Sequence, residues 1–230
     1  MKNLWIFGDS FSAPFKGLAH WAWFQKYLAF LGKDKFSTWQ EIVAKNLDLK
    51  VVELGETAIS NSEIFDRFAM NCNRFAKGDF VVINWTLTER FRVPDDGTAK
   101  FLNLIPSSLA QADYEDRFFT LEDIQKIGVS RMDKLYQTEI NHWANLINEF
   151  CKLKGITIVY WGLTDTQPYY DFDISMEEKV KHKLRILDHQ VENEDHHFSI
   201  YGHEYVANII TNLLKNYKEK PAELFTKRLV

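Results

Sequence analysis

Short apolar runs alternate along this chain with segments of helical spacing. Each run is dominated by β-branched and aromatic residues, and the runs cover residues 3–7, 50–54, 79–85 and 156–161. Strands that are apolar on both faces need cover on both sides, which is typical of a parallel sheet between two layers of helices. The segments of helical spacing are residues 39–47, 62–75, 132–154 and 201–217. The order predicts an α/β fold, a three-layer α/β/α sandwich around a central parallel sheet.

The composition is that of an ordinary globular protein. Of 230 residues, 46% are hydrophobic and 26% charged, so the chain can bury a full core as one domain. A net charge of −4 with both signs interspersed gives no basis for binding nucleic acid. No apolar run reaches the ~18 residues of a membrane span. Cys72 and Cys151 make no disulfide framework and favour a reducing compartment.

The two ends of the chain and one internal stretch set the expected domain limits. Because Met1-Lys2-Asn3 leads straight into the first strand, we expect no signal peptide and a cytoplasmic location. Residues 92–130 carry little pattern and contain Pro94, Gly97 and Pro106, so we expect an insert that serves as a lid or sets specificity. The prediction is one domain over residues 1–217, with this insert, and a charged tail over 218–230.

The tripeptide Gly8-Asp9-Ser10 directly follows the first predicted strand. The loop before the last predicted helix carries Asp195 and His197. In open α/β sheets, ligands bind at the carboxyl ends of the strands, and both loops are expected at that edge. A serine hydroxyl becomes a nucleophile when a histidine removes its proton and a carboxylate orients the histidine. These residues therefore suggest a catalytic triad of Ser10, His197 and Asp195, although a turn serine is the common role of such a tripeptide.

These two segments resemble the first and last conserved blocks of the SGNH, or GDSL-type, serine hydrolases. The first is Phe7-Gly8-Asp9-Ser10-Phe11-Ser12, and the second runs from His197 through Gly202-His203 into an apolar helix. Residues 39–44 and 51–61 are similar to the stretch that leads into the second block. The resemblance covers most of the chain outside residues 92–130 and the tail. It implies a flavodoxin-like sandwich and hydrolysis of a carboxylic ester through an acyl-serine intermediate.

The acid of the triad stays open between two neighbours. The resemblance places it three residues before the histidine, at Glu194, whereas Asp195 lies two residues before it. We prefer Asp195 because its shorter side chain suits a tight turn.

The oxyanion hole implied by the family departs from the usual pattern. The resemblance implies donors from the Ser10 N–H, from a second-block N–H best matched by Ala58, and from a third-block side chain. The third block lacks the usual asparagine, and its register gives Thr88. Gly55 and Asn84 remain alternatives at the second and third positions.

Three further features have plainer explanations. His196, His197 and His203 lie close together, but their spacing fits no metal motif, so we expect neither a metal nor another cofactor.

Within residues 17–32, a helical stripe predicts a packing face or a dimer surface rather than a pocket wall. The stripe consists of Trp21, Phe24, Leu28 and Leu31. The aromatic residues Trp23, Tyr27 and Phe30 lie off this stripe. Arg90 and Arg92 either meet an acidic substrate group or are solvated.

The resulting expectation is a serine esterase that removes a short acyl group such as acetyl, on a small molecule or a carbohydrate. One alternative is an O-acyltransferase, because an alcohol can replace water on the same triad. The other is a catalytically weak domain that binds glycans or a protein partner. No nucleic-acid or membrane partner is expected, and a homo-oligomer is left open.

Overall fold

Four parallel strands form the central sheet of the computed structural model. The structure describes residues 1–86, 90–94, 101–104, 129–162, 171, 179, 181–189 and 196–217, and only the backbone at 91–94, 101–104 and 129–134. The strands are β1 (Asn3–Phe7), β2 (Lys50–Glu53), β3 (Phe80–Asn84) and β6 (Thr157–Trp161). Their order is β2-β1-β3-β6, with every neighbouring pair parallel. The four predicted apolar runs are these four strands.

Strands β1, β3 and β6 are buried on both faces, because successive side chains point to opposite sides of a sheet, whereas the edge strand β2 is only partly buried. In β1, Trp5 and Phe7 enter one core, whereas Leu4 and Ile6 enter the other. Strands β3 and β6 alternate in the same way. This double burial is why the predicted runs carry no polar face.

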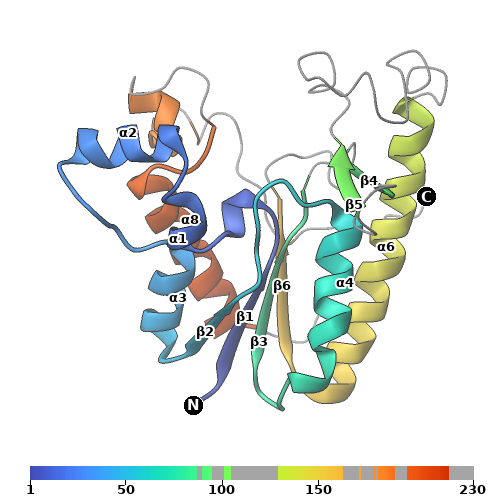
Figure 1. Ribbon diagram of the computed structural model, residues 1–230. Helices are drawn as coiled ribbons and strands as arrows, with labels where there is room; N and C mark the ends of the chain where they lie inside the picture. Colours follow the sequence, from blue (N-terminus) through green and yellow to red (C-terminus); the bar gives the residue numbers. More distant parts are fainter. Residues whose placement is uncertain are drawn as a thin grey trace.

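Helices cover both faces of the sheet, so the fold is the predicted α/β sandwich (Figure 1). On one face lie α3 (Trp39–Leu47) and α8 (Ile200–Lys215), which pack against each other. The other face is covered by α4 (Asn61–Asn71) and the long α6 (Val129–Lys154). In the described residues, no helix is long and apolar enough to cross a membrane.

The helix ends follow from local capping. The Ser60 hydroxyl accepts a hydrogen bond from the Glu63 N–H at 3.4 Å and caps the start of α4. A short 3-10 turn, η2 (Cys72–Arg74), ends the segment predicted as one helix over 62–75. Gly155, in the left-handed region with φ of 66°, follows α6 and ends it.

A third cluster of apolar residues lies beyond the carboxyl ends of the strands. It joins Ala13, which directly follows η1 (Ser10–Ser12), with α1 (Phe15–Leu18) and α2 (Ala22–Leu31) to the short helix η5 (Ile186–His189). Figure 1 shows α2 above α3, at the end of the sheet away from the N-terminus, with α1 beside the upper part of α8.

The predicted stripe on α2 is partly wrong. Phe24 and Leu28 are buried, but the third buried residue is Tyr27, and Trp21 is 41% exposed. Trp21 precedes the first turn of the helix, so it does not share the orientation of the later residues. The packed face turns toward Tyr27 because that side contacts the start of α8.

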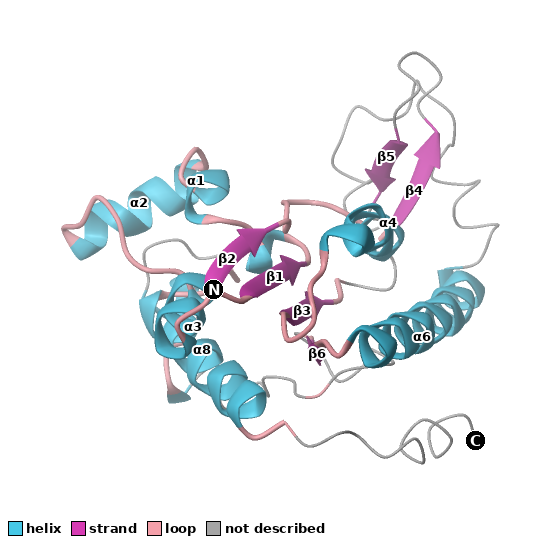
Figure 2. Ribbon diagram, turned by 90° about the horizontal axis from the view of Figure 1, so that it is seen from below, coloured by secondary structure: helices cyan, strands magenta, loops and turns pink. Residues whose placement is uncertain are grey.

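A small hairpin occupies part of the predicted insert. Strands β4 (Phe91–Pro94) and β5 (Phe101–Leu104) pair antiparallel, with Phe91 opposite Leu104. Strand β4 lies against α4, as Figure 2 also shows. Residues 95–100 and 105–128 of the insert, and the predicted tail 218–230, lie outside the described residues.

Candidate active site

The chain turns sharply after β1 and places Ser10 at the carboxyl edge of the sheet. Gly8 allows this turn, since a Cβ there would lie 2.7 Å from the Asn84 Cβ and 2.8 Å from the Ser12 Oγ. Asp9 then caps η1 by accepting a hydrogen bond from the Phe11 N–H at 3.1 Å. Ser10 is the first residue of η1 and is partly exposed. Strands β1 and β3 are neighbours here, at the point where the strand order changes direction, which is where open sheets bind ligands.

The Asp9 carboxylate ties this turn to the segment after β3. Its Oδ2 accepts a hydrogen bond from the Thr86 Oγ1 at 2.6 Å and lies 3.6 Å from the Arg90 guanidinium. Thr86 is held in turn by Asn61 at the start of α4. The Asn61 Oδ1 accepts from the Thr86 N–H at 2.8 Å, and its Nδ2 donates to the Thr86 carbonyl at 3.0 Å.

The segment after β2 passes directly over η1. The Glu56 N–H donates to the Gly8 carbonyl at 3.0 Å, which extends the parallel pairing past the strand ends. At Gly55, a Cβ would lie 2.2 Å from the Ser12 carbonyl oxygen, so only glycine permits this approach. Ala58 adopts the left-handed region with φ of 64°, a conformation that favours glycine.

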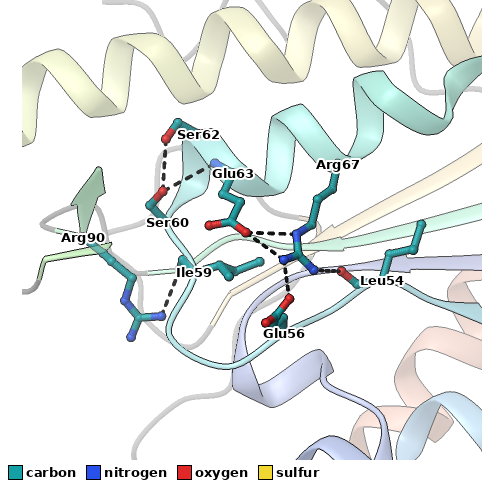
Figure 3. Close-up of polar contacts among 8 residues, drawn as sticks. All are labelled: Leu54, Glu56, Ile59, Ser60, Ser62, Glu63, Arg67 and Arg90. Carbon is teal, nitrogen blue, oxygen red and sulfur yellow. Dashed lines mark hydrogen bonds and ion pairs between the residues drawn. The ribbon is translucent and has the colours of Figure 1, made fainter. Parts of the chain in front are cut away.

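Two arginines brace this segment from opposite sides (Figure 3). Arg67 on α4 donates to the Leu54 carbonyl at 3.2 Å and forms ion pairs with Glu56 and Glu63. Arg90 donates to the Ile59 carbonyl at 3.1 Å, next to Ala58. The backbone around Ala58 is thereby fixed at both of its ends.

His197 reaches the same edge of the sheet from the far end of the chain. Its segment pairs with residues 184–186, since the Ile186 N–H donates to the His197 carbonyl at 2.9 Å. The imidazole stacks on Phe11, with ring centroids 4.8 Å apart and planes 17° apart. It also stacks on Trp23 of α2, at 4.3 Å and 11°. Because Phe11 directly follows Ser10, the structure brings the predicted nucleophile and the predicted base into one neighbourhood.

A second histidine nearby has a structural role. The His203 Nδ1 accepts a hydrogen bond from the Trp39 N–H at 3.2 Å, at the first residue of α3. Burial, together with the charge of His197, lowers the pKa of His203 to about 3. A neutral imidazole at this place can keep accepting the first N–H of α3.

Comparison with known proteins leaves the family open. No family model and no curated protein matches the chain. A solved structure from Desulfitobacterium hafniense DCB-2, described as a "putative lipolytic protein of G-D-S-L family", is similar over 93% of this chain and 99% of its own. The two chains share 13% identity, with a TM-score of 0.34. At these values the likeness carries no weight for activity.

The predicted site residues fall into two groups. The first group lies in the described part of the chain and consists of Ser10, Gly55, Ala58, Asn84 and His197. All of them except His197 lie on the first three strands or on the segments directly after them. Thr88, Glu194 and Asp195 lie outside the described residues, so their roles stay predictions.

Asn84 and the two candidate backbone donors differ in their surroundings. Asn84 is fully buried, and its Nδ2 donates to the Trp85 carbonyl at 3.2 Å while its Oδ1 accepts from the Ser12 Oγ at 3.4 Å. Within the described residues, no hydrogen bond engages the N–H of Ser10 or of Ala58.

Sequence reasoning did not predict the contacts that frame the site, which are made by Asn61, Thr86, Arg90 and Trp23. It considered Arg90 only as a substrate-binding or solvated cation, and Trp23 only as an aromatic residue off the packing stripe. The partners Asp9 and His197 lie far from these residues in the sequence, so no local pattern indicates the contacts. In the described part of the chain, no group of three His, Cys, Asp or Glu residues could hold a metal ion.

Proposed function

We propose that the chain is a serine esterase of the SGNH, or GDSL-type, family. The observation that carries this proposal is the stacking of His197 on Phe11, the residue after Ser10, at the carboxyl edge of the sheet. Ser10 is the nucleophile and His197 the general base. Asp195 orients the imidazole, with Glu194 as the alternative acid. The proposed domain is residues 1–217, with residues 92–130 as an insert that serves as a lid or sets specificity.

In the proposed reaction, His197 takes the proton of the Ser10 hydroxyl while the oxygen attacks the ester carbonyl. The negative oxygen of the tetrahedral intermediate accepts hydrogen bonds from the N–H groups of Ser10 and Ala58. His197 then gives its proton to the leaving alcohol. Water attacks the acyl-serine with the same base, which releases the acid and restores Ser10.

Two features support Ala58 as an oxyanion donor. Its left-handed backbone is the conformation expected where the family places glycine, and its segment is braced by Arg67 and Arg90. Rigid donors aimed at a developing charge are worth about 3 kcal/mol each. Thr88 is the proposed third donor. Asn84 is the weaker alternative because its amide already bonds to Trp85 and Ser12.

Labelling with a fluorophosphonate probe tests the proposal. We expect the wild-type chain to be labelled and Ser10→Ala to lose labelling, because the probe forms a covalent bond with an activated serine. Ser37→Ala, at an exposed serine, is the matched control and should label normally. Failure of the folded wild-type chain to label, where a known serine esterase does, would contradict the proposal.

The same probe separates the two acids. Asp195→Ala should slow labelling by orders of magnitude and Glu194→Ala by little. The imidazole of His197 loses its orientation only when the carboxylate that holds it is removed. The reverse result would assign the acid to Glu194.

The proposed substrate is an ester of a short acyl group such as acetyl, on a small molecule or carbohydrate. Hydrolysis of p-nitrophenyl acetate in preference to longer acyl chains would support it. An O-acyltransferase would instead give an ester product when an alcohol acceptor is added. The other alternative is a catalytically weak domain that binds glycans or a protein partner. Such a domain would bind its glycan or partner, but the fluorophosphonate probe would not label it.

A further inference from the structure

Helix α2 holds the His197 segment at two places one turn apart. At the first, the Trp23 ring stacks on the imidazole of His197. At the second, the Tyr27 hydroxyl oxygen accepts the N–H of Ile200 at 2.9 Å, at the first residue of α8. Tyr27 is fully buried, so this contact is part of the core. Residues i and i+4 share one face of a helix, and this face of α2 is the one that meets the histidine.

The imidazole lies between two aromatic rings. Phe11 and Trp23 are both nearly parallel to it, with planes 17° and 11° away and centroids 4.8 and 4.3 Å away. If Phe11 and Trp23 lay on the same face of the imidazole at these distances, their rings would overlap. They therefore lie on its opposite faces. Trp23 is itself fixed by an edge contact with the buried Phe24, at 5.5 Å and 89°. The ring of His197 is thus restricted from both sides.

Aromatic faces are negative, and they attract a cation that lies over them. A neutral imidazole gains little from this attraction, whereas an imidazolium gains it from both rings. The general base of a serine esterase becomes an imidazolium in the transition state, when it accepts the hydroxyl proton. The stacking therefore favours the charged state that the reaction needs.

We propose that Trp23 is a positioning residue for His197, which fixes the imidazole plane together with Phe11 and stabilises its protonated form. The catalytic consequence rests on the proposed function, but the effect on the proton affinity of His197 does not. Trp23 does not touch the reacting atoms in this proposal. Trp23 lies off the packing stripe predicted for this helix, and its contact with His197 gives it a chemical role.

Two titratable groups near His197 do not change charge between pH 5 and 8. His203 on α8 stays neutral there because its pKa is lowered to about 3. Burial, its largest cause, raises the pKa of Tyr27 on α2 above its usual range. Other titratable or charged groups around His197 are Asp9 before η1, paired with Arg90; Arg185, paired with Asp188; Lys26 on α2; His189 on η5, which lies against Tyr27 and Tyr201; and His196, Tyr201 and Glu204. The proposed acids Asp195 and Glu194 are present in every variant compared, so they do not alter the comparison.

The test follows the titration of His197 by NMR in the Ser10→Ala background, where no turnover occurs. We expect Trp23→Leu to lower the pKa of His197 by roughly 0.5 to 1 pH unit, because the cation loses one aromatic face. Trp23→Phe should restore most of the loss. Trp21→Leu, at the 41% exposed tryptophan just before α2, is the matched control and should leave the titration unchanged.

An unchanged or raised pKa in folded Trp23→Leu would overturn the inference. Where that variant does not fold, Phe11→Leu provides the second measurement, and its pKa should fall in the same direction. In the otherwise wild-type chain, Trp23→Leu should lower kcat several-fold and change KM little. A rise in KM alone, with kcat and the titration unchanged, would assign Trp23 to substrate binding and also overturn the inference.

The two proposals fail separately. If the wild-type chain is not labelled by fluorophosphonate while the His197 titration shifts as expected, the esterase proposal fails and the stacking effect stands. If labelling depends on Ser10 but the titration does not respond to Trp23, only the inference about Trp23 fails.

Discussion

Arg90 is the charged side chain that joins the three segments around Ser10. It follows β3, donates to the Ile59 carbonyl after β2, and pairs with Asp9 after β1. Its side chain is 11% exposed and that of Asp9 only 4%. The Asp9 carboxylate is too poorly hydrated to be stable without Arg90. A buried ion without its partner lowers the stability of the fold by far more than the intact pair contributes to it.

We expect Arg90→Met to lower the free energy of unfolding by about 2–4 kcal/mol, since it leaves the Asp9 carboxylate buried without its cation. Chemical denaturation measures this change. Lys35→Met removes the exposed pair with Glu41 at 3.2 Å and should cost less than about 1 kcal/mol. Equal losses in the two variants would contradict a special role for Arg90.

At the scale of elements, the main lengths and types of the helices and strands follow from local pattern. Runs that need cover on both faces became strands, and Ser60 and Gly155 mark helix ends through capping. Helix α1 and the β4–β5 hairpin were not predicted. For α2, the predicted packing face was partly wrong because that face depends on α8. Local spacing indicates that a helix has an apolar side, but its neighbours decide which residues meet the core.

The contact between the segment after β2 and η1 depends on a missing side chain. We expect Gly55→Ala to destabilise the fold by roughly 1–3 kcal/mol, since the new Cβ would lie 2.2 Å from a backbone oxygen of Ser12. It should also slow fluorophosphonate labelling, because η1 carries Ser10. Gly17→Ala is the control. Its Cβ would meet Pro14 at 3.6 Å, an ordinary contact, so stability should be unchanged or slightly higher.

At the scale of the whole molecule, a hydrogen bond joins helix α3, near the start of the chain, to helix α8, near its end. His203 on α8 accepts the first N–H of α3 through Nδ1, and it can do so only while that nitrogen carries no proton. Its pKa is about 3 in the fold, against the usual 6.5. Between about pH 3 and 6.5, His203 is therefore protonated in the unfolded chain and neutral in the folded chain.

This difference sets a pH dependence of global stability. The contribution of His203 is fully present above pH 6.5 and is lost as the pH falls toward 3, at a slope approaching about 1.4 kcal/mol per pH unit. His203→Asn keeps an oxygen acceptor and cannot titrate, so it should flatten the curve of unfolding free energy between pH 6.5 and 4.5. His20→Asn, at an exposed histidine, should leave the curve as it is.

A further loss of stability should remain below about pH 4 in both variants. Burial by itself raises the pKa of Asp79, but hydrogen bonds from the Asn3 N–H, the Trp5 indole and the Ala76 N–H outweigh it and lower that pKa. A carboxyl of lowered pKa contributes stability above its unfolded value and loses it as the pH falls. A curve for His203→Asn that is unchanged between pH 6.5 and 4.5 would refute the assignment to His203.

The sequence by itself determined the sandwich and which loops contain candidate chemistry. Apolar runs with no polar face require cover on both sides, and a Gly-Asp-Ser turn after the first run places a hydroxyl at the strand ends. Only the tertiary structure decided what surrounds those residues: Trp23 on His197, Arg90 between Asp9 and Ile59, and the left-handed Ala58. These contacts join residues far apart in the chain, and periodicity and capping, which act within a few residues, carry no information about them.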